Sequence, residues 1–364
     1  MKNQLLILAA ILSTCHALIA QNVSAPKYSN EFLNIGVGAR ALGMGRSQVA
    51  HVSDVTSGYW NPAGLTDIAT KYDVAYMHNE YYAGIAQYDY AAVARKIDST
   101  SSIGLTYIRF GIDNIPNTLR LFDSYGGIDY NRVTYFSATD NAFLLTYAGK
   151  VKKIPGLKLG TNFKVIYRNI GSFANAWGFG LDAGAKYKRK NWLFGLAVRD
   201  ITSTFNVWTI NSSELTSAYA QSSALGVSNT VPSNSIELTL PRLILGTARY
   251  FNLTKNKKFG LLGSIDLDFT FDGKRNVAIR SKATSIDPKF GFELNYIKTI
   301  YLRAGAGGIQ QQENFEGNTY RSWDPNFGVG VRIKSLTIDY SLTNLNNLSD
   351  GLYSNVISLR LNLN

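Results

Sequence analysis

The chain has 364 residues and a formal net charge of +12, with 45% hydrophobic and 17% charged residues. Glycine, tyrosine and phenylalanine are frequent, at 32, 22 and 18 residues, whereas proline occurs only 8 times. No apolar run of 18 residues occurs beyond residue 20, which excludes a mature protein that crosses a membrane with helices. The single cysteine, Cys15, excludes a disulfide framework.

The first residues predict a secretory signal peptide over residues 1–20. Lys2 supplies the basic start, Leu5 to Leu12 form the apolar core, and cleavage is expected after Ala20. Cys15 raises the alternative of a lipoprotein, but Thr14 is a poor residue before a lipidated cysteine and the apolar run continues beyond it. Cleavage after Ala20 leaves a mature chain without thiol chemistry.

Residues 57–65, SGYWNPAGL, predict a single capped helical turn ahead of the first strand. Asn61 can cap a helix start, and Pro62 suits the first helical position. Gly64 is expected to end the turn almost at once. Tyr59 and Trp60 then lie beside the turn as two large aromatic side chains.

From Lys71 onward, apolar and polar residues alternate with a period of two, which is typical of strands. In residues 259–271, for example, Ile265 and Leu267 fall on one face and Asp266 and Asp268 on the other. Fourteen such segments are expected, near residues 72–79, 86–96, 101–110, 140–151, 156–169, 177–189, 191–199, 236–251, 257–271, 288–298, 300–308, 325–334, 335–343 and 354–363. Two sequences could disturb the pairing of these strands, namely Pro241 in LTLPRLIL and the glycine-rich run AGAGGIQ.

The connections between these segments alternate in length. Those after even-numbered segments are short and rich in lysine, whereas most of those after odd-numbered segments are long, at 111–139, 200–235, 272–287, 309–324 and 344–353. Short turns at one end and long loops at the other are typical of outer-membrane barrels, and a soluble β-sandwich does not have this parity. The basic charge lies largely in the short turns, which favours a membrane surface over nucleic acid as its partner.

The predicted fold is therefore all-β: a 14-stranded antiparallel transmembrane β-barrel, located in the cell outer membrane. Residues 1–20 are the expected signal peptide, 21–70 an N-terminal segment and 71–364 the barrel. The lipid face is expected to include Phe179, Leu181, Leu267, Phe269, Val329, Val331, Leu359 and Leu361. The lumen face carries charges of both signs, at Lys164, Arg168, Asp182, Lys186, Asp266, Asp268, Glu293, Arg332, Asp339 and Arg360.

These lumenal charges are expected to pair with one another across a narrow barrel, and with Arg40 and Arg46 of the N-terminal segment. That pairing predicts a packed polar interior rather than an open pore. The alternative is that the charges are simply solvated in a wet lumen.

The sequence shows no pattern for catalysis, metal binding or nucleic-acid recognition. His51 and His78 lack ligand spacing, and the Asp266–Asp268 pair is explained better by lumenal ion pairs than by Ca²⁺. The run GVGARA lacks the last glycine of a dinucleotide fingerprint, and neither a hydrolase motif nor a nucleic-acid motif is present. We expect no enzyme activity, no cofactor, no metal and no nucleic-acid partner.

Residues 31–65 carry a more specific signal, in Phe32-Leu33, in GARALGMG at residues 38–45, in Asp54 and in YWNPAGL at residues 59–65. This segment resembles the PorV/PorQ family of Bacteroidetes outer-membrane proteins, which are distant relatives of the FadL long-chain fatty-acid transporters. The resemblance implies that residues 21–70 form an N-terminal plug, or hatch, inside a 14-stranded barrel. The plug residues that it indicates are Gly38, Arg40, Gly43, Gly45, Tyr59, Trp60, Asn61, Pro62 and Ala63.

The resemblance implies a scaffold in type IX secretion that engages the translocon, secreted cargo or surface partners, in addition to outer-membrane lipid. The loop residues expected to contact protein partners are Leu121, Phe122, Tyr125, Tyr130, Tyr135, Phe136, Phe205 and Trp208. An alternative is that these loops fold over the barrel mouth and bury the same residues. The alternative function is a FadL-like transporter of hydrophobic small molecules such as long-chain fatty acids, which would need an apolar pocket in the outer loops and a lateral opening in the wall.

Overall fold

The structure is a computed structural model that describes residues 28–122, 126–216, 233–313, 317–345 and 353–364. The predicted signal peptide and residues 21–27 lie outside the described residues.

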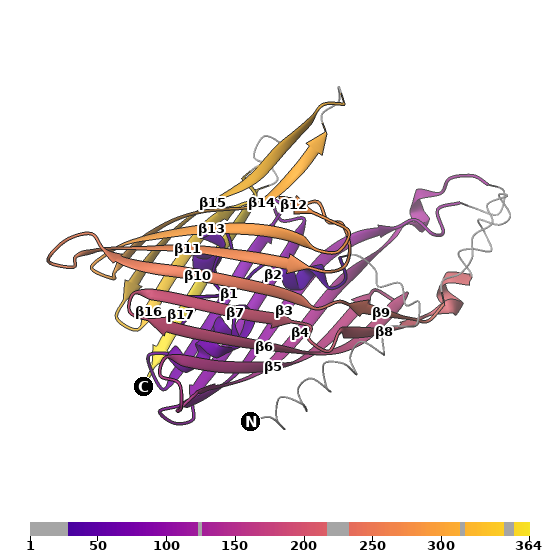
Figure 1. Cartoon of the computed structure of the whole chain (residues 1–364). Helices are drawn as coiled ribbons and strands as arrows, with labels where there is room; N and C mark the ends of the chain where they lie inside the picture. Colours follow the sequence, from indigo (N-terminus) through magenta and orange to yellow (C-terminus); the bar gives the residue numbers. More distant parts are fainter. Residues whose placement is uncertain (1–27, 123–125, 217–232, 314–316, 346–352) are drawn as a thin grey trace.

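One antiparallel sheet curls into a barrel (Figure 1). Its described strands are β1 (Tyr72–Tyr81), β2 (Ala86–Lys96), β3 (Ser101–Asn117), β4 (Thr134–Lys150), β5 (Leu157–Ile170), β6 (Ala174–Arg189), β7 (Trp192–Arg199), β8 (Thr204–Ile210), β9 (Ser235–Thr239), β10 (Arg242–Asn252), β11 (Phe259–Thr270), β12 (Ile279–Arg280), β13 (Ser285–Tyr296), β14 (Ile300–Glu313), β15 (Thr319–Ile333), β16 (Leu336–Thr343) and β17 (Ser354–Leu363). The first strand, β1, pairs with the last, β17, from Tyr72 opposite Leu363 to Glu80 opposite Asn355, and this pairing closes the barrel.

The wall contains fourteen strands, which confirms the predicted fold. Both β7 and β8 pair with β6, so they are two parts of one wall strand. The strands β9 and β10 continue each other in the same way, with only Leu240 and Pro241 between them. The short β12 pairs only with the start of β13 and is an addition to the wall.

The sequence-based prediction was wrong about where the strands end on the long-loop side. β3 and β4 extend into the expected loop 111–139, β14 and β15 extend into 309–324, and β8 lies within 200–235. Figure 1 shows the β14–β15 hairpin projecting well beyond the barrel wall. Both faces of such projecting strands meet solvent, so they carry no alternation of hydrophobicity from which they could be recognised.

Both expected disturbances of the strand pairing occur. The strand containing Pro241 breaks between β9 and β10, because proline cannot donate a ladder hydrogen bond. In the run AGAGGIQ, the register between β14 and β15 shifts between Gly307 and Gln310.

The two faces of the wall follow the predicted register. The outward side chains form an apolar surface: Phe179, Leu181, Leu267, Val329, Val331, Leu359 and Leu361 are all exposed, and Phe269 is partly exposed on the same face. The predicted lumenal charges are buried or half-buried, with Asp266 at 0% and Glu293 at 1% exposure. An exterior of this kind requires a hydrocarbon environment.

The described part of the chain also contains short helices, namely η1 (Glu31–Asn34), α2 (Ala39–Gly43), α3 (Ser57–Trp60), η2 (Pro62–Asp67) and η3 (Tyr130–Arg132). None of the helices in the described ranges has the length and apolarity needed to cross a membrane.

Residues 28–71 fold inside the barrel and form the plug. Its helices η1, α2, α3 and η2 appear in indigo within the ring of strands in Figure 1. Wall glycines let the plug approach closely: a Cβ on Gly305 would lie 2.1 Å from the backbone nitrogen of Gly45, and one on Gly160 would lie 2.4 Å from the carbonyl carbon of Pro62. A buried apolar cluster joins the plug to the wall through Leu65 and Ile108.

Candidate functional site

Asn61 anchors the plug to the wall. Its side-chain oxygen accepts a hydrogen bond from the Ala63 amide at 3.2 Å and caps η2, with Pro62 at the first helical position as predicted. Its amide nitrogen donates to the carbonyl oxygens of Val49 at 2.9 Å and of Ala185 in β6 at 3.1 Å. The single buried amide therefore fixes both the turn and its position against the wall.

The expectation that Gly64 ends this turn was wrong, because η2 continues to Asp67. Gly64 instead allows a close contact: a Cβ there would lie 2.7 Å from the Val52 carbonyl oxygen and 2.7 Å from the Ser57 hydroxyl. The glycine is required here by packing rather than by helix termination.

Tyr59 and Trp60 are buried between the plug segments and hydrogen-bonded. The Tyr59 hydroxyl donates to the Leu33 carbonyl at 2.5 Å, and the Trp60 indole donates to the Val37 carbonyl at 2.9 Å. The Arg199 guanidinium of β7 lies 4.5 Å from the centre of the Tyr59 ring.

The other predicted plug residues also lie at contacts within the plug or with the wall. Gly38 and Gly45 have φ angles of 83° and 62°, which favour glycine. A Cβ on Gly43 would meet the Gly328 backbone at 2.9 Å, and Ala63 is fully buried.

Ion pairs hold the plug at several points around the wall. Arg40 binds Glu293 of β13 through two hydrogen bonds of 2.7 and 2.9 Å, so the predicted pairing of plug and lumen charges occurs. The other pairs are Arg46 with Asp324 of β15 at 3.3 Å, Asp54 with Arg360 of β17, and Asp67 with Lys158 of β5 and Lys186 of β6.

Burial and neighbouring charges shift the pKa values of two plug residues, His51 and Asp54. Burial lowers the pKa of His51 to about 3, and the nearby Arg40 acts in the same direction, so His51 is neutral. For Asp54, burial alone would raise the pKa, but Arg360 and Arg40 outweigh it and hold that pKa below its usual value.

The wall is interrupted at its long-loop end. Pairing between β7 and β10 stops at Arg199 opposite Arg242, and it resumes between β8 and β9 at Thr204 opposite Thr239. Among the described strands, β9 pairs only with β8, whereas β10 pairs with β11 no further than Thr270. We call the interval between residues 237–242 and residues 270–275 the seam.

The first described residues of the plug bridge the seam. The Ser29 hydroxyl hydrogen-bonds to Glu237 of β9 at 2.5 Å and to the Thr239 hydroxyl at 2.7 Å. On the opposite side, Arg275 pairs with Glu31 at 2.8 Å. About 30 Å³ of free volume remains there. Side-chain contacts of the plug thus replace a strand ladder at this place in the wall.

A buried charge cluster holds the segment between β7 and β8 in place beside the seam. Lys164 of β5 binds Asp182 at 3.0 Å and Asp200 at 2.5 Å. The Asp200 amide donates to Asp182 at 2.9 Å, and Thr204 donates to the Asp200 carboxylate. These specific contacts fix the break between β7 and β8, so neither strand is simply frayed there.

A cavity of about 900 Å³ opens at the long-loop end above the plug. Its lining mixes apolar side chains with charged ones. The apolar side chains include Phe32, Ile35, Phe110, Trp208 and Ile236, and the charged ones are Glu31, Arg46, Asp140, Arg168 and Glu237. The Trp208 indole donates to Glu237 at 2.8 Å, and the Arg168 guanidinium lies 5.0 Å from the ring. The cavity shares residues 28, 30 and 31 of the plug, and Glu237, with the contacts of the seam. We call it the mouth cavity.

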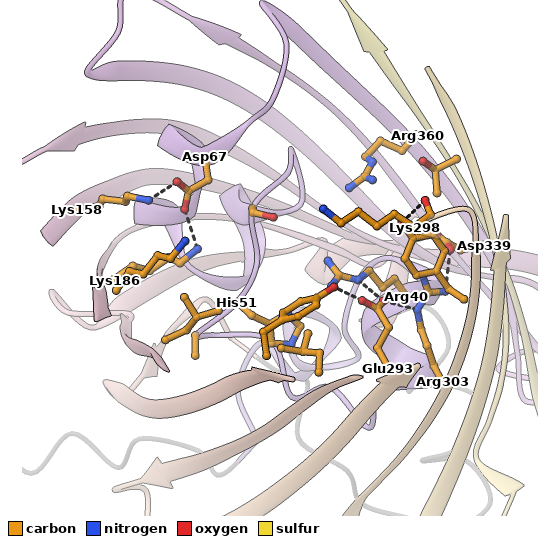
Figure 2. Close-up of a pocket in the computed structure, with 18 of the residues that line it drawn as sticks. Arg40, His51, Asp67, Lys158, Lys186, Glu293, Lys298, Arg303, Asp339 and Arg360 are labelled. Carbon is orange, nitrogen blue, oxygen red and sulfur yellow. Dashed lines mark hydrogen bonds and ion pairs between the residues drawn. The ribbon is translucent and has the colours of Figure 1, made fainter. Parts of the chain in front are cut away.

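A second cavity, of about 560 Å³, lies at the short-turn end below the plug. In Figure 2, Lys158 and Lys186 both bind Asp67, and Arg40 and Glu293 are joined to each other. The remaining charged side chains of its lining are Lys188, Lys298, Arg303, Asp339 and Arg360. Charged residues make up 10 of the 21 residues that line this cavity, against 5 of 16 in the mouth cavity.

The structure separates the predicted partner-binding residues into groups. Phe122, Tyr130 and Tyr135 are exposed near the β3–β4 connection, with Tyr130 at 76%, and Leu121 is half-buried. Phe136 packs against Phe173, with ring centres 5.1 Å apart. Tyr125 lies outside the described residues.

Phe205 and Trp208 do not lie in a loop as predicted, because both belong to β8. Phe205 is on the outward face beside Phe179, with ring centres 5.9 Å apart, whereas Trp208 lines the mouth cavity. In the described ranges, no group of three or more His, Cys, Asp or Glu side chains could hold a metal ion.

No protein-family model matches the chain, and no curated protein matches it. Solved structures do match. The toluene transporter TodX of Pseudomonas putida superposes with a TM-score of 0.57 at 12% identity, over 90% of this chain and 98% of that one. The CymD monoaromatic hydrocarbon channel gives a TM-score of 0.55 at 12% identity, over 90% and 98%. A FadL homologue of Pseudomonas aeruginosa gives 0.52 at 13% identity, over 89% and 97%.

The protein is thus a transmembrane β-barrel of the outer membrane. Its fold is that of the FadL-like barrels, with fourteen antiparallel strands closed around an N-terminal segment.

Proposed function

We propose that this barrel admits small hydrophobic molecules through the outer membrane by way of the mouth cavity and the seam. The observation that carries the proposal is that Asn30 and Glu31, which lie in the plug segment bridging the interrupted wall, also line the mouth cavity. Neutral aromatic hydrocarbons are the first substrates to test, because the similar solved structures include toluene transporters.

A sideways route avoids the ion pairs beneath the plug, although the seam itself is lined by charged side chains, including Lys164, Asp200, Arg242 and Arg275. A molecule passing along the lumen would meet the ion pairs of Glu293, Asp67 and Lys186 and the polar cavity beneath the plug. Moving sideways through the seam leads instead to the apolar exterior of the wall and to lipid, where each Å² of buried apolar surface contributes about 25 cal/mol. The interrupted wall at the seam supports the lateral route that this proposal requires.

Opening the seam requires little disruption. The contacts of Ser29, Asn30 and Glu31 across it are a few side-chain hydrogen bonds and one ion pair. Each neutral contact contributes about 0.5–1.5 kcal/mol net and each contact with a charged group about 1.5–3 kcal/mol, so displacement of this short segment costs several kcal/mol and leaves a minor open population. The rest of the plug, held by Asn61 and by its ion pairs, can stay in place.

A reversible crosslink tests this route. The Ser29 and Thr239 hydroxyls lie 2.7 Å apart, so Ser29→Cys with Thr239→Cys places two thiols within disulfide reach, and the sequence contains no other cysteine beyond Cys15. Cells carrying the oxidised double variant should take up radiolabelled toluene no faster than cells without the protein, and reduction should restore uptake. Each single-cysteine variant serves as the matched control and should transport normally. Unchanged uptake with the disulfide fully formed would refute the seam as the route.

A second candidate function is a PorV/PorQ-type scaffold that engages protein partners in type IX secretion. The exposed side chains of Phe122, Tyr130 and Tyr135 and the filled lumen favour it. Deletion of residues 118–133 should then abolish co-purification of a large partner while the barrel still assembles. The solved structures with the same fold support the transporter better, because they are transporters and channels of hydrophobic compounds.

A further inference from the structure

The outer wall carries a row of cationic and aromatic side chains at its short-turn end. Across β6, β7 and β10, Trp192 lies directly opposite both Arg189 and Arg249, so the three side chains share the outward face. The next row toward the membrane centre is Tyr187 with Phe194, and the row after it contains Leu196 with Leu245. We call Tyr187, Arg189, Lys190, Trp192, Phe194 and Arg249 the interfacial cluster.

The cluster has positive charge without compensation. Residues 183–199 and 242–265 contain ten lysines and arginines and no aspartate or glutamate. Some of these cations face the lumen and pair there, as Lys186 does with Asp67. The outward-facing Arg189, Lys190 and Arg249 form no ion pair within the described residues. Three cations on one small surface therefore lack an anionic partner from the chain itself.

Aromatic rings hold one of these cations in place. The guanidinium carbon of Arg249 lies 4.9 Å from the centre of the Trp192 ring and 4.9 Å from that of Phe251. Trp192 and Phe194 stack with their centres 6.3 Å apart and their planes 13° from parallel. A guanidinium flanked by two rings loses less conformational freedom when it binds a ligand than a free side chain does.

A surface groove of about 470 Å³ lies on this cluster, lined by Tyr187, Arg189, Lys190, Trp192 and Phe194. Arg249 is not part of this lining but lies next to it, against the Trp192 ring. Its two ends differ in chemistry. The Arg189 and Lys190 end adjoins the short β6–β7 turn, at the depth where a bilayer has its headgroups, and the Phe194 end faces hydrocarbon. The groove thus joins a phosphate-compatible end to an apolar one.

We propose that the interfacial cluster binds a diacyl phospholipid with an anionic headgroup from the leaflet at the short-turn end, which in outer-membrane barrels faces the periplasm. Guanidinium groups bind phosphate oxygens bidentately, so Arg189 and Arg249 hold the phosphate, with Lys190 adding charge at the rim. The acyl chains lie along Tyr187 and Phe194 and then along Leu196 and Leu245. This site lies on the outer wall and does not depend on whether the barrel transports anything.

Native mass spectrometry of the full-length mature protein, released from detergent and titrated with phosphatidylglycerol, tests this assignment. The variant Arg189→Gln with Arg249→Gln removes both guanidiniums. The matched control, Lys152→Gln with Lys153→Gln, removes the same charge from the short β4–β5 turn, where neither lysine contacts a ring. Heat-dependent gel mobility verifies that each barrel is folded.

The cluster variant should bind phosphatidylglycerol about tenfold or more weakly than the parent, because two charge-assisted contacts are lost. The control should stay within about twofold of the parent, and phosphatidylethanolamine should bind all three proteins alike and weakly. If the double variant fails to fold, the single Arg249→Gln change should still weaken binding about threefold to tenfold. Equal loss in the cluster and control variants, or competition by free glycerol phosphate as strong as that by the lipid, would overturn the proposal.

Discussion

At the residue scale, the chain determines its interior largely through charges and glycines whose partners are far away in sequence. Alternation alone assigned Glu293 and Asp268 to the lumen, and both are buried there. Their partners could not be predicted, because Arg40 and Glu293 are 253 positions apart and only the closed barrel brings them together. Similarly, nothing local marks Gly305 as a contact for the plug.

Gly305→Ala should unseat the plug. Its Cβ would meet the backbones of Met44 and Gly45 at 2.1 Å, and neither the wall nor the plug backbone can yield cheaply. We expect a loss of about 1–3 kcal/mol of stability, measured by the temperature at which the folded gel band is lost. Gly149→Ala is the matched control, since no atom lies within 4 Å of its added Cβ. Equal effects of the two changes would refute the close approach of plug and wall.

His51 should make the barrel sensitive to mild acid. The pKa of His51 is about 3 in the fold and about 6.5 in the unfolded chain. Below pH 6.5 the unfolded state therefore binds more protons than the folded state, and the free energy of unfolding decreases as the pH is lowered. Between pH 6 and 4.5, the parent should lose about 1.4 kcal/mol per pH unit more than His51→Gln in urea unfolding. Parallel curves for the two proteins across this range would contradict the buried neutral state of His51.

At the scale of elements, the sequence predicted strands well inside the membrane and poorly outside it. Alternation located β11, β15 and β17 because one face meets lipid and the other the lumen. It missed β8 and the outer halves of β3 and β4, where both faces meet solvent or the mouth cavity. Pro241 was the one local signal that the wall is interrupted, and it marks the break between β9 and β10.

Ile265→Arg tests the register of the wall. Ile265 is exposed on the outer face near the middle of β11, so a guanidinium there should cost roughly 2–4 kcal/mol and reduce the folded yield in outer-membrane fractions. Ile154→Arg, in the short β4–β5 turn, makes the same change outside the apolar belt and should be nearly neutral. Equal yields of the two variants would show that the outward face has been assigned to the wrong side chains.

At the scale of the whole molecule, loop parity and strand length were sufficient to predict a closed barrel, and the resemblance of residues 31–65 implied the plug. The seam could not be predicted in the same way. It arises where β9 lacks a second neighbour and residues 29–31 substitute for one, which depends on the ends of five strands and on how the plug lies across them. The proposed route of entry could therefore be inferred only from the three-dimensional structure.

The most direct test of the central claim, that hydrophobic molecules enter by the mouth cavity and the seam, is a crystal soaked with 4-bromotoluene. The bromine can be located by anomalous scattering. The account predicts a bromine site in the mouth cavity against Phe32, Trp208 or Ile236, and a weaker one at the seam beside Pro241. Bromine sites confined to the outer apolar face of the wall, with none in the cavity or the seam, would contradict it.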